Sequence, residues 1–264
     1  MIYDCFQFFN EFDTLEIRLE ELYPVVDLFV ICESTMTHSG KSKNLRYLEN
    51  SNRYKKYQDK IKYIVYDQFP TQYTSWMLEN NQRRFMITAI PTSIKDSDLV
   101  FISDVDEIPR RSFMEKIVKD HYRNNSIAFP VTLCTQLYYN KLTYKVTEPD
   151  EFHNWRGTVV IDGKTLKQNS DLHWYRHYKD TFPNIKNTGW HFSYLGDEKQ
   201  IIEKIESFAH TESDTPEIKE TIRNNLDKCV DLFGRTEYKM EHVEVDDTYP
   251  ELVKNNIERF RHLV

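Results

Sequence analysis

The strongest constraint on the fold is an alternation of apolar runs and amphipathic helices in the first 110 residues. The run at 25–32, Val-Val-Asp-Leu-Phe-Val-Ile-Cys, is almost wholly apolar, which is typical of a strand buried on both faces of a parallel sheet. Similar strand patterns lie at 2–9, 61–66 and 99–102, with helix patterns at 13–22 and 76–90. The alternation predicts an α/β fold with a doubly wound, mostly parallel sheet flanked by helices, whose ligands bind at the carboxyl ends of the strands.

The second half of the chain is less regular. Strand patterns lie at 127–133, 137–146, 155–161 and 189–194. The Asp162-Gly163 pair predicts a turn, and from Asp197 onward the pattern is helical. We find neither an internal repeat nor a linker, so we expect a single domain with a helical C-terminal part.

Composition excludes several classes of protein. The net charge of −7 and the isoelectric point near 5.8 argue against a protein whose main partner is nucleic acid. No stretch approaches the ~20 apolar residues of a transmembrane helix, and the N-terminus lacks the pattern of a secretory signal. The four cysteines have no metal-ligand spacing, so we expect free thiols in a soluble, cytoplasmic protein.

Two carboxylates follow the predicted strand at 99–102. Asp104 and Asp106 lie two positions apart, and in an extended segment such residues project to the same side, where they can share one ion. Mn²⁺ and Mg²⁺ take oxygen ligands and leave positions open for substrate phosphates. The pair therefore predicts a divalent-metal site that serves a diphosphate. The alternative is a turn in which two acidic residues precede Pro109.

The same pair has a second enzymatic interpretation. Phosphatases of the haloacid-dehalogenase type also carry Asp-x-Asp after an apolar strand and use the first Asp as nucleophile. Their motif lies on the first strand and continues with Thr or Val, whereas here the motif begins at Asp104 and the equivalent position is Ile108. A catalytically silent protein that binds sugar nucleotides or glycans is the third interpretation.

Several segments together resemble glycosyltransferase family 17, the family of the enzyme that adds the bisecting N-acetylglucosamine to N-glycans. The similar segments include Phe9-Asn10-Glu11-Phe12-Asp13, Ile102-Ser103-Asp104-Val105-Asp106-Glu107-Ile108-Pro109, Gly189-Trp190-His191-Phe192-Ser193 and a closing basic-aromatic helix at 255–263. Their order and spacing extend the resemblance over most of the chain.

The resemblance implies a GT-A fold with a Rossmann-like sheet, in one domain over 1–264. Within it, 1–110 is the nucleotide-binding half and 111–264 the acceptor-side half. The implied reaction is inverting transfer of a sugar to a glycan acceptor, with UDP-N-acetylglucosamine as the donor in the known animal member. The sequence lacks the membrane anchor of the Golgi members, so we expect an intracellular enzyme of bacterial or viral origin.

Inverting transfer needs a general base that takes the proton of the acceptor hydroxyl. Glu198 and Asp197, at a predicted helix start after Gly196, are the first candidates, and Glu107 and Glu212 are the reserves. The structural alternative for Asp197 is a helix N-cap, and for Glu198 it is a first-turn acid favoured by the helix dipole.

Two neighbouring residues on a late strand pattern are further candidates. His191 is expected either as a metal ligand beside Asp104 and Asp106 or as a hydrogen-bonded core residue. Trp190 either stacks on a sugar ring or lies in the core. Asp104 is expected to contact the donor as well as the ion.

Polar residues at strand ends are candidates for donor binding. Asn10 and Glu11 follow the first predicted strand and Glu33 ends the second, where nucleotides bind in such sheets. Either Arg83 or Arg84 is expected to hold the donor diphosphate. Adjacent helical residues point about 100° apart, so we do not expect both to do so.

Overall fold

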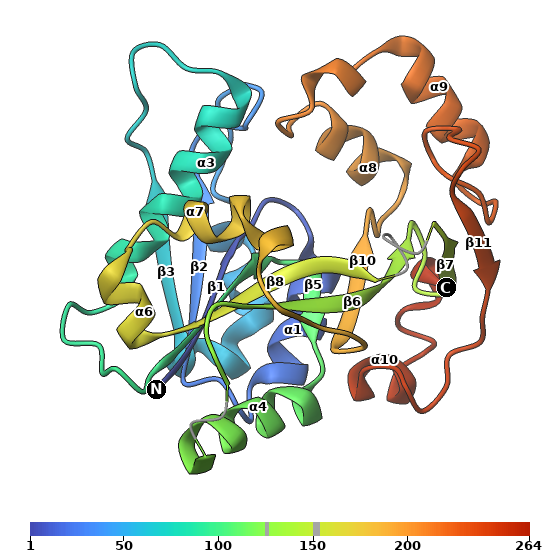
Figure 1. Cartoon of the computed structure of the whole chain (residues 1–264). Coiled ribbons are helices and arrows are strands. Elements are labelled where there is room, and N and C mark those ends of the chain that lie inside the picture. The colour runs from blue at the N-terminus through green and yellow to red at the C-terminus, as the bar shows by residue number, and fades with distance from the viewer. Residues whose placement is uncertain (125–126, 150–153) are drawn as a thin grey trace.

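The computed structural model describes residues 1–124, 127–149 and 154–264, and one sheet crosses the molecule (Figure 1). The described strands are β1 (Ile2–Gln7), β2 (Leu28–Ser34), β3 (Ile61–Tyr66), β4 (Leu99–Asp104), β5 (Glu107–Pro109), β6 (Val131–Tyr139), β7 (Tyr144–Glu148), β8 (Trp155–Asp162), β9 (Asn184–Ile185), β10 (Gly189–Ser193) and β11 (Lys239–His242). Along the main path of the sheet their order is β11-β7-β6-β8-β4-β1-β2-β3.

The four strands of the first half are parallel. β1 lies between β2 and β4, and β2 also pairs with β3. The register places Gln7 opposite both Cys32 and Asp104, so β1, β2 and β4 end at the same edge of the sheet. This is the edge at which the sequence predicts a ligand site.

The second half adds strands of mixed direction. β8 is antiparallel to both β4 and β6, and β7 is antiparallel to both β6 and β11. β10 runs parallel to β6 and antiparallel to β5. The predicted α/β class, with a central sheet between helices, is confirmed. The prediction of a mostly parallel sheet holds for β1 to β4, whereas the second half is mixed.

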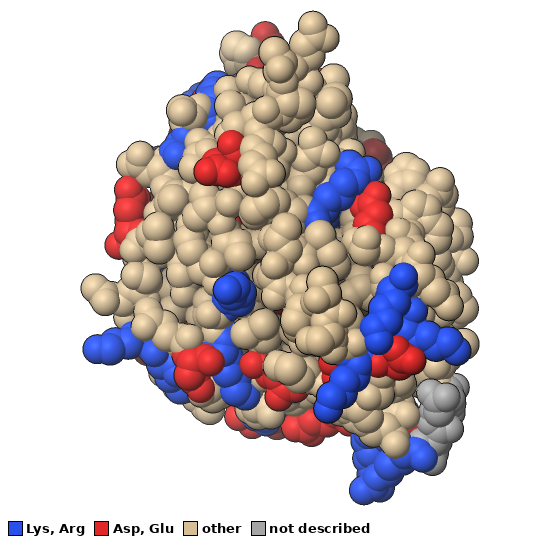
Figure 2. All heavy atoms as spheres, turned by 90° about the vertical axis from the view of Figure 1, so that its left-hand side faces the viewer, with Lys and Arg blue, Asp and Glu red and all other residues tan. Residues whose placement is uncertain are grey.

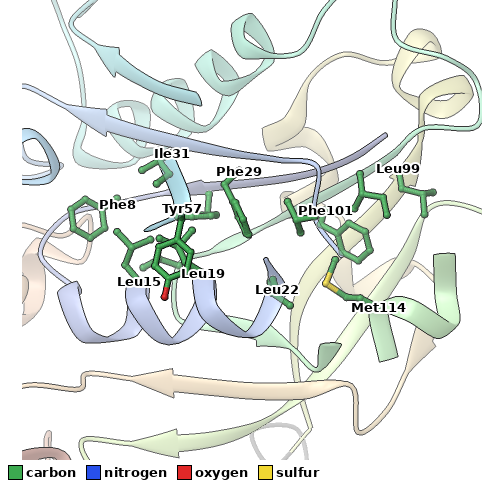
Figure 3. Close-up of a cluster of buried hydrophobic side chains, with 14 of the residues drawn as sticks. Phe8, Leu15, Leu19, Leu22, Phe29, Ile31, Tyr57, Leu99, Phe101 and Met114 are labelled. Atoms are coloured by element: carbon green, nitrogen blue, oxygen red, sulfur yellow. The ribbon is translucent and has the colours of Figure 1, made fainter. Parts of the chain in front are cut away.

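Helices cover both faces of the sheet. On one face, helix α1 (Phe12–Leu22) packs Leu15, Leu19 and Leu22 against Phe29 and Phe101 (Figure 3). The three leucines recur at helical spacing and form one apolar stripe, which is why the helix lies flat on the sheet. The other face is covered by α3 (Ser75–Phe85), η2 (Met86–Ala89), α6 (Gly163–Gln168) and α7 (Leu172–His177).

The remaining helices belong mainly to the second half. They are α2 (Arg46–Glu49), η1 (Ser51–Lys60), α4 (Arg111–Asn124), η3 (Lys179–Thr181), α8 (Glu198–Ile205), η4 (Thr211–Ser213), α9 (Pro216–Asn225), α10 (Glu251–Asn255) and η5 (Arg261–Leu263). Figure 1 shows α8 and α9 standing opposite α3, above the sheet in that view. Within the described ranges, no helix combines the length and apolar character needed to cross a membrane.

Two local predictions are wrong and one is confirmed. Asp162 does not form a turn with Gly163 but caps α6, and its carboxylate accepts the Thr165 N–H at 2.8 Å. The predicted closing helix at 255–263 is interrupted, because α10 ends at Asn255 and residues 261–263 form the separate turn η5. The four cysteines are free thiols, as predicted.

Charges of both signs share the face shown in Figure 2. Lys and Arg side chains alternate there with Asp and Glu and do not gather in one patch. A protein that grips a nucleic-acid backbone needs a continuous basic stripe, and this face does not provide one.

Candidate functional site

A cavity of about 700 Å³ opens at the carboxyl edge of β1 and β4. Both halves of the chain line it, since α3 forms one side and the segment after α8 forms another. The two sides meet where Ser75 Oγ donates to the Ala209 carbonyl at 2.8 Å and where the Trp76 and His210 rings lie 4.6 Å apart. Its charged lining residues and histidines are Glu11, His38, Lys43, Glu79, Arg83, Asp104, Asp106, His191, Lys204, His210 and Arg235.

Asp104 ends β4 and is held by two guanidinium groups. Arg83 of α3 donates to Oδ1 at 2.7 Å, and Arg176 of α7 donates to Oδ2 at 2.8 Å. Burial opposes ionisation of the Asp104 carboxyl, but Arg83 and Arg176 outweigh it and hold its pKa well below the usual range. The two guanidinium groups therefore stabilise the ionised carboxylate and fix its direction. With 41% of its side chain exposed, it still faces the cavity.

The loop after Asp104 is anchored from below by Arg18 of α1. Arg18 Nη1 donates to the backbone carbonyls of Asp104 at 3.1 Å, Val105 at 3.3 Å and Glu107 at 2.8 Å. Its other nitrogens form a buried ion pair with Asp4 at 2.5 and 2.8 Å. Arg18 thus supplies hydrogen-bond donors to carbonyl groups that would otherwise be buried without a partner. These bonds fix the path of the backbone.

Glu107 fixes the same loop from the side. Its Oε2 accepts the Asp104 N–H at 2.9 Å, and its Oε1 accepts Trp155 Nε1–H at 2.8 Å and Arg176 Nη2–H at 3.0 Å. A Cβ on Gly157 would lie 2.8 Å from Glu107 Cδ, so only glycine fits beside it. Because Glu107 is fully buried and engaged at both oxygens, its geometry suits positioning and does not suit the predicted reserve role of general base.

Asp106 faces the cavity and has two cationic or titratable neighbours. Lys204 Nζ lies 3.4 Å from Oδ2, and His191 Nε2 lies 3.4 Å from Oδ1. Lys204 Nζ also lies 3.1 Å from Glu11 Oε1. Burial opposes ionisation of Asp106, but Lys204 and His191 outweigh it and lower its pKa to about 2. Burial alone would lower the pKa of Lys204, yet Glu11 and Asp106 raise it.

The predicted metal ligands only partly converge. His191 and Asp106 lie side by side, but the Asp104 carboxylate is directed at Arg83 and Arg176, and Lys204 occupies the other oxygen of Asp106. Among the described residues, no group of three or more His, Cys, Asp or Glu side chains is arranged to hold a metal ion. The donor set as it stands therefore does not fit Mn²⁺ or Mg²⁺.

The two residues of the late strand have different surroundings. His191 lines the cavity and lies against Trp155, with ring centroids 4.8 Å apart. Trp190 is buried in the core beside Phe192, and Arg110 lies over its ring at 4.6 Å. The core alternative is thus the one that fits Trp190. Trp155, which sequence reasoning did not select, is the tryptophan that lines the cavity at this point.

Of the predicted donor-binding residues at strand ends, Glu11 lines the cavity. Asn10 is buried, and its Nδ2 donates to Glu203 Oε2 at 3.0 Å. Glu33 is fully buried, and its oxygens accept the backbone N–H groups of Arg46 at 2.7 Å and Tyr47 at 3.0 Å. Its place therefore suits holding the chain after β2 and does not suit contact with a ribose.

Arg83 and Arg84 point in different directions, as expected for adjacent residues of a helix. Arg83 is buried at the cavity and also bonds Glu79 at 2.9 Å. Arg84 points away and pairs with Asp171 at 3.0 Å near the surface. Arg83 is thus the member of the pair that can meet a cavity ligand.

The first candidates for a general base lie outside the cavity. Asp197 caps α8, with its side chain accepting the Gln200 N–H at 2.8 Å, and Glu198 pairs with Arg223 at 2.8 Å on an exposed surface. Both border a different depression, so the structural alternatives describe them better. The reserve Glu212 accepts from His210 Nδ1 at 2.7 Å, and His210 does line the cavity.

Comparison with known proteins supplies the family. The sequence model described as glycosyltransferase family 17 matches residues 1–262. This chain belongs to glycosyltransferase family 17. The resemblance seen in the sequence motifs is therefore confirmed over nearly the whole chain.

Curated family 17 relatives share part of the sequence. The human and rat proteins named beta-1,4-mannosyl-glycoprotein 4-beta-N-acetylglucosaminyltransferase are each 32% identical over 109 residues, and the mouse protein of that name is 31% identical. The match covers 39% of this chain and spans 20% of the length of those relatives. A solved structure titled "Crystal Structure of a Mycobacterial Protein" aligns over 95% of this chain and 86% of its own, with a TM-score of 0.41 and 11% identity.

The candidate site includes three cations that the sequence patterns did not single out. Arg18 carried a usable signal, since it lies on the apolar stripe of α1 with Leu15 and Leu19, and a charge on such a stripe needs a buried partner. Arg176 comes from a helix of 6 residues, which is too short to show a clear helical period. Lys204 lies on an amphipathic helix, where lysine ordinarily faces solvent.

Proposed function

We propose that this family 17 chain transfers a sugar, with inversion, from a nucleotide-sugar donor in the cavity to a hydroxyl group of a glycan acceptor. The name of the mammalian relatives supports N-acetylglucosamine as the sugar, carried as UDP-N-acetylglucosamine. The observation that carries the proposal is the loop of Asp104 and Asp106. Arg18 fixes this loop, and Asp104 and Asp106 line a cavity at the carboxyl edge of the parallel strands. Nucleotides bind at this edge in doubly wound sheets.

The cavity lining suits two sugar-bearing substrates. Phe8 and Phe9 follow β1 and line the cavity, and Phe9, the less buried of the two, offers an apolar face to a nucleoside. Trp155, Tyr139 and Tyr194 line the part contributed by the second half, where sugar rings can pack on aromatic faces while hydroxyl groups reach polar neighbours. In this arrangement the donor nucleotide lies over the first half and the acceptor approaches from the second, as the predicted division at residue 110 implies.

Within this proposal, His210 is the general base. Glu212 Oε1 accepts a hydrogen bond from Nδ1–H at 2.7 Å, which leaves Nε2 unprotonated and able to accept a proton. The Trp76 ring packs edge-on against the imidazole at 4.6 Å and limits its motion. The acceptor hydroxyl would lose its proton to Nε2 as its oxygen attacks the anomeric carbon.

The predicted Mn²⁺ or Mg²⁺ takes no part in this proposal. Arg83 and Arg176 engage Asp104, and Lys204 stands between Asp106 and Glu11, so the carboxylates already have cationic partners. The predicted cytoplasmic location and bacterial or viral origin remain predictions.

A thermal-shift panel tests the proposed function. UDP-, GDP-, CMP- and dTDP-sugars are added separately, each with Mn²⁺ and with EDTA. A ligand at about 100 Kd stabilises the folded protein by about 2.7 kcal/mol, so UDP-N-acetylglucosamine should raise the melting temperature clearly. A flat response to every nucleotide sugar would contradict the proposal.

A second assay separates transfer from the alternatives. Release of UDP that depends on an added glycan supports transfer, whereas donor binding without glycan-dependent release supports the silent binder. Hydrolysis of phosphomonoesters would support the phosphatase. The geometry already disfavours a phosphatase, because two guanidinium groups occupy the oxygens of Asp104, the would-be nucleophile.

A further inference from the structure

We infer that Lys204 is the built-in cation of the donor site and meets the donor diphosphate where the sequence predicts a divalent ion. The inference rests on the proposed function and deepens it, since it names the residue that binds the leaving group and removes the need for a metal.

The position of Lys204 carries the inference. Its ammonium group lines the cavity and lies 3.1 Å from Glu11 Oε1 and 3.4 Å from Asp106 Oδ2. Glu11 follows the first strand and Asp106 follows the fourth, so Lys204 bridges the two strand ends between which a diphosphate is expected. A divalent ion bound to Asp106 would have to displace this ammonium from between the two carboxylates.

Among the described residues, the ammonium group of Lys204 pairs with two carboxylates and lies 5.3 Å from the centre of the Tyr194 ring. The second oxygen of Glu11 accepts the backbone N–H groups of Phe9 and Asn10, both at 3.1 Å, so this carboxylate cannot turn away. The helix that carries Lys204 begins with a complete capping box at Asp197. An ammonium has three N–H donors, and the two carboxylates take two of them. The third can bind a phosphate oxygen.

The site also has the charge that a departing diphosphate needs. In the proposed transfer, the bond between the anomeric carbon and the diphosphate oxygen breaks, and its electron pair stays on that oxygen. The acceptor oxygen forms the new bond to the anomeric carbon, and its proton passes to the base. Lys204 stabilises the negative charge that develops on the diphosphate oxygen through its own positive charge, as a metal ion would. It transfers no proton in this step.

Calorimetric titration of UDP tests the inference. The wild type is measured in EDTA and in Mn²⁺, beside Lys204→Met, Lys204→Arg and the matched control Lys199→Met, which changes an exposed lysine of the same helix. We expect equal UDP affinity in EDTA and Mn²⁺ for the wild type. We expect Lys204→Met to lose affinity by a factor on the order of 10 to 100, the range of a charge-assisted hydrogen bond, with a smaller loss for Lys204→Arg and none for Lys199→Met.

The outcomes separate this inference from the proposed function. A wild type that binds no nucleoside diphosphate in either buffer contradicts the proposed function itself. A wild type that binds UDP in Mn²⁺ but not in EDTA overturns the inference and leaves the function standing. Unchanged affinity in Lys204→Met also overturns it. Melting curves accompany each variant. If Lys204→Met does not fold, the wild-type comparison of EDTA with Mn²⁺ still tests the role of the metal, and Lys204→Arg tests the role of the residue.

Discussion

The two sides of the Asp104–Asp106 loop are built differently. The buried side is a closed network in which Arg18 pairs with Asp4 and holds three loop carbonyls, at distances from 2.5 to 3.3 Å and without solvent exposure. On the cavity side, Lys204 and His191 approach Asp106 at 3.4 Å. The difference indicates a rigid support on the buried side of the loop and, beside Asp106, longer ion pairs whose cations can also contact a ligand. The following predictions test this division.

The largest effect should come from the buried side. Arg18→Met leaves the Asp4 carboxylate buried without its cation and removes the donors to three carbonyls. Loss of one partner from a buried ion pair costs about 3–5 kcal/mol, so the free energy of unfolding should fall by that amount in urea denaturation. Arg84→Met, which removes a partly exposed arginine, is the control and should change stability little. Equal effects of the two substitutions would show that the buried network is not the support described here.

A cavity-side residue should affect activity without such a loss of stability. His210→Asn removes the proposed base and should lower kcat by at least about 10²-fold, while the melting temperature stays near that of the wild type. Glu212→Gln should cause a smaller loss, because it disturbs only the orientation of the imidazole. Steady-state kinetics with UDP-N-acetylglucosamine and a glycan acceptor measure both. Full activity in His210→Asn would assign the base elsewhere.

Asp106 should contribute to stability in a pH-dependent way. Its pKa is about 2 in the folded protein, below the ordinary value of about 3.9, so its ionised form stabilises the fold by about 2–3 kcal/mol. That contribution is complete above about pH 4 and is lost as the pH falls through about 2. Urea denaturation between pH 6 and pH 2 should therefore show the gap between wild type and Asp106→Asn narrowing on acidification. Asp247→Asn, at an exposed carboxylate, is the control, and a gap independent of pH would contradict the assignment.

The smallest effect should come from Glu198. Its side chain is half exposed and pairs with Arg223 outside the cavity, so Glu198→Gln should leave both kcat and the melting temperature close to the wild-type values. A drop in kcat of about 10²-fold or more would restore Glu198 as the general base.

The sequence predicted the first half of the fold better than the second for a physical reason. Strands buried on both faces, such as β2 and β4, are continuous apolar runs, and the amphipathic α1 shows its leucine stripe directly. The second half mixes strand directions, which no local pattern encodes, and the helix α7 has only 6 residues, too few to show a clear helical period. Contacts between segments that are distant in the sequence determine both the strand directions and the position of this helix.

The sequence predicted the site residues that lie at the ends of parallel strands. Asp104 and Asp106 lie at the cavity because strand ends meet at one edge. Glu33 also lies near the end of a strand, but the chain folds back over it. The backbone N–H groups of Arg46 and Tyr47 donate to its carboxylate, and no local sequence pattern predicts such a tertiary contact. Lys204 could not be selected for the same reason, since its partners are about 100 and 190 residues away, at Asp106 and Glu11.

The most direct test of the account is a crystal structure of the wild-type protein with UDP-N-acetylglucosamine, grown in EDTA. The account predicts the diphosphate at the Asp104–Asp106 edge of the cavity, with a phosphate oxygen within hydrogen-bond distance of Lys204 Nζ and the nucleoside near Phe8 and Phe9. A donor bound elsewhere on the protein, or one that binds only when a metal ion lies between Asp106 and the diphosphate, would contradict it.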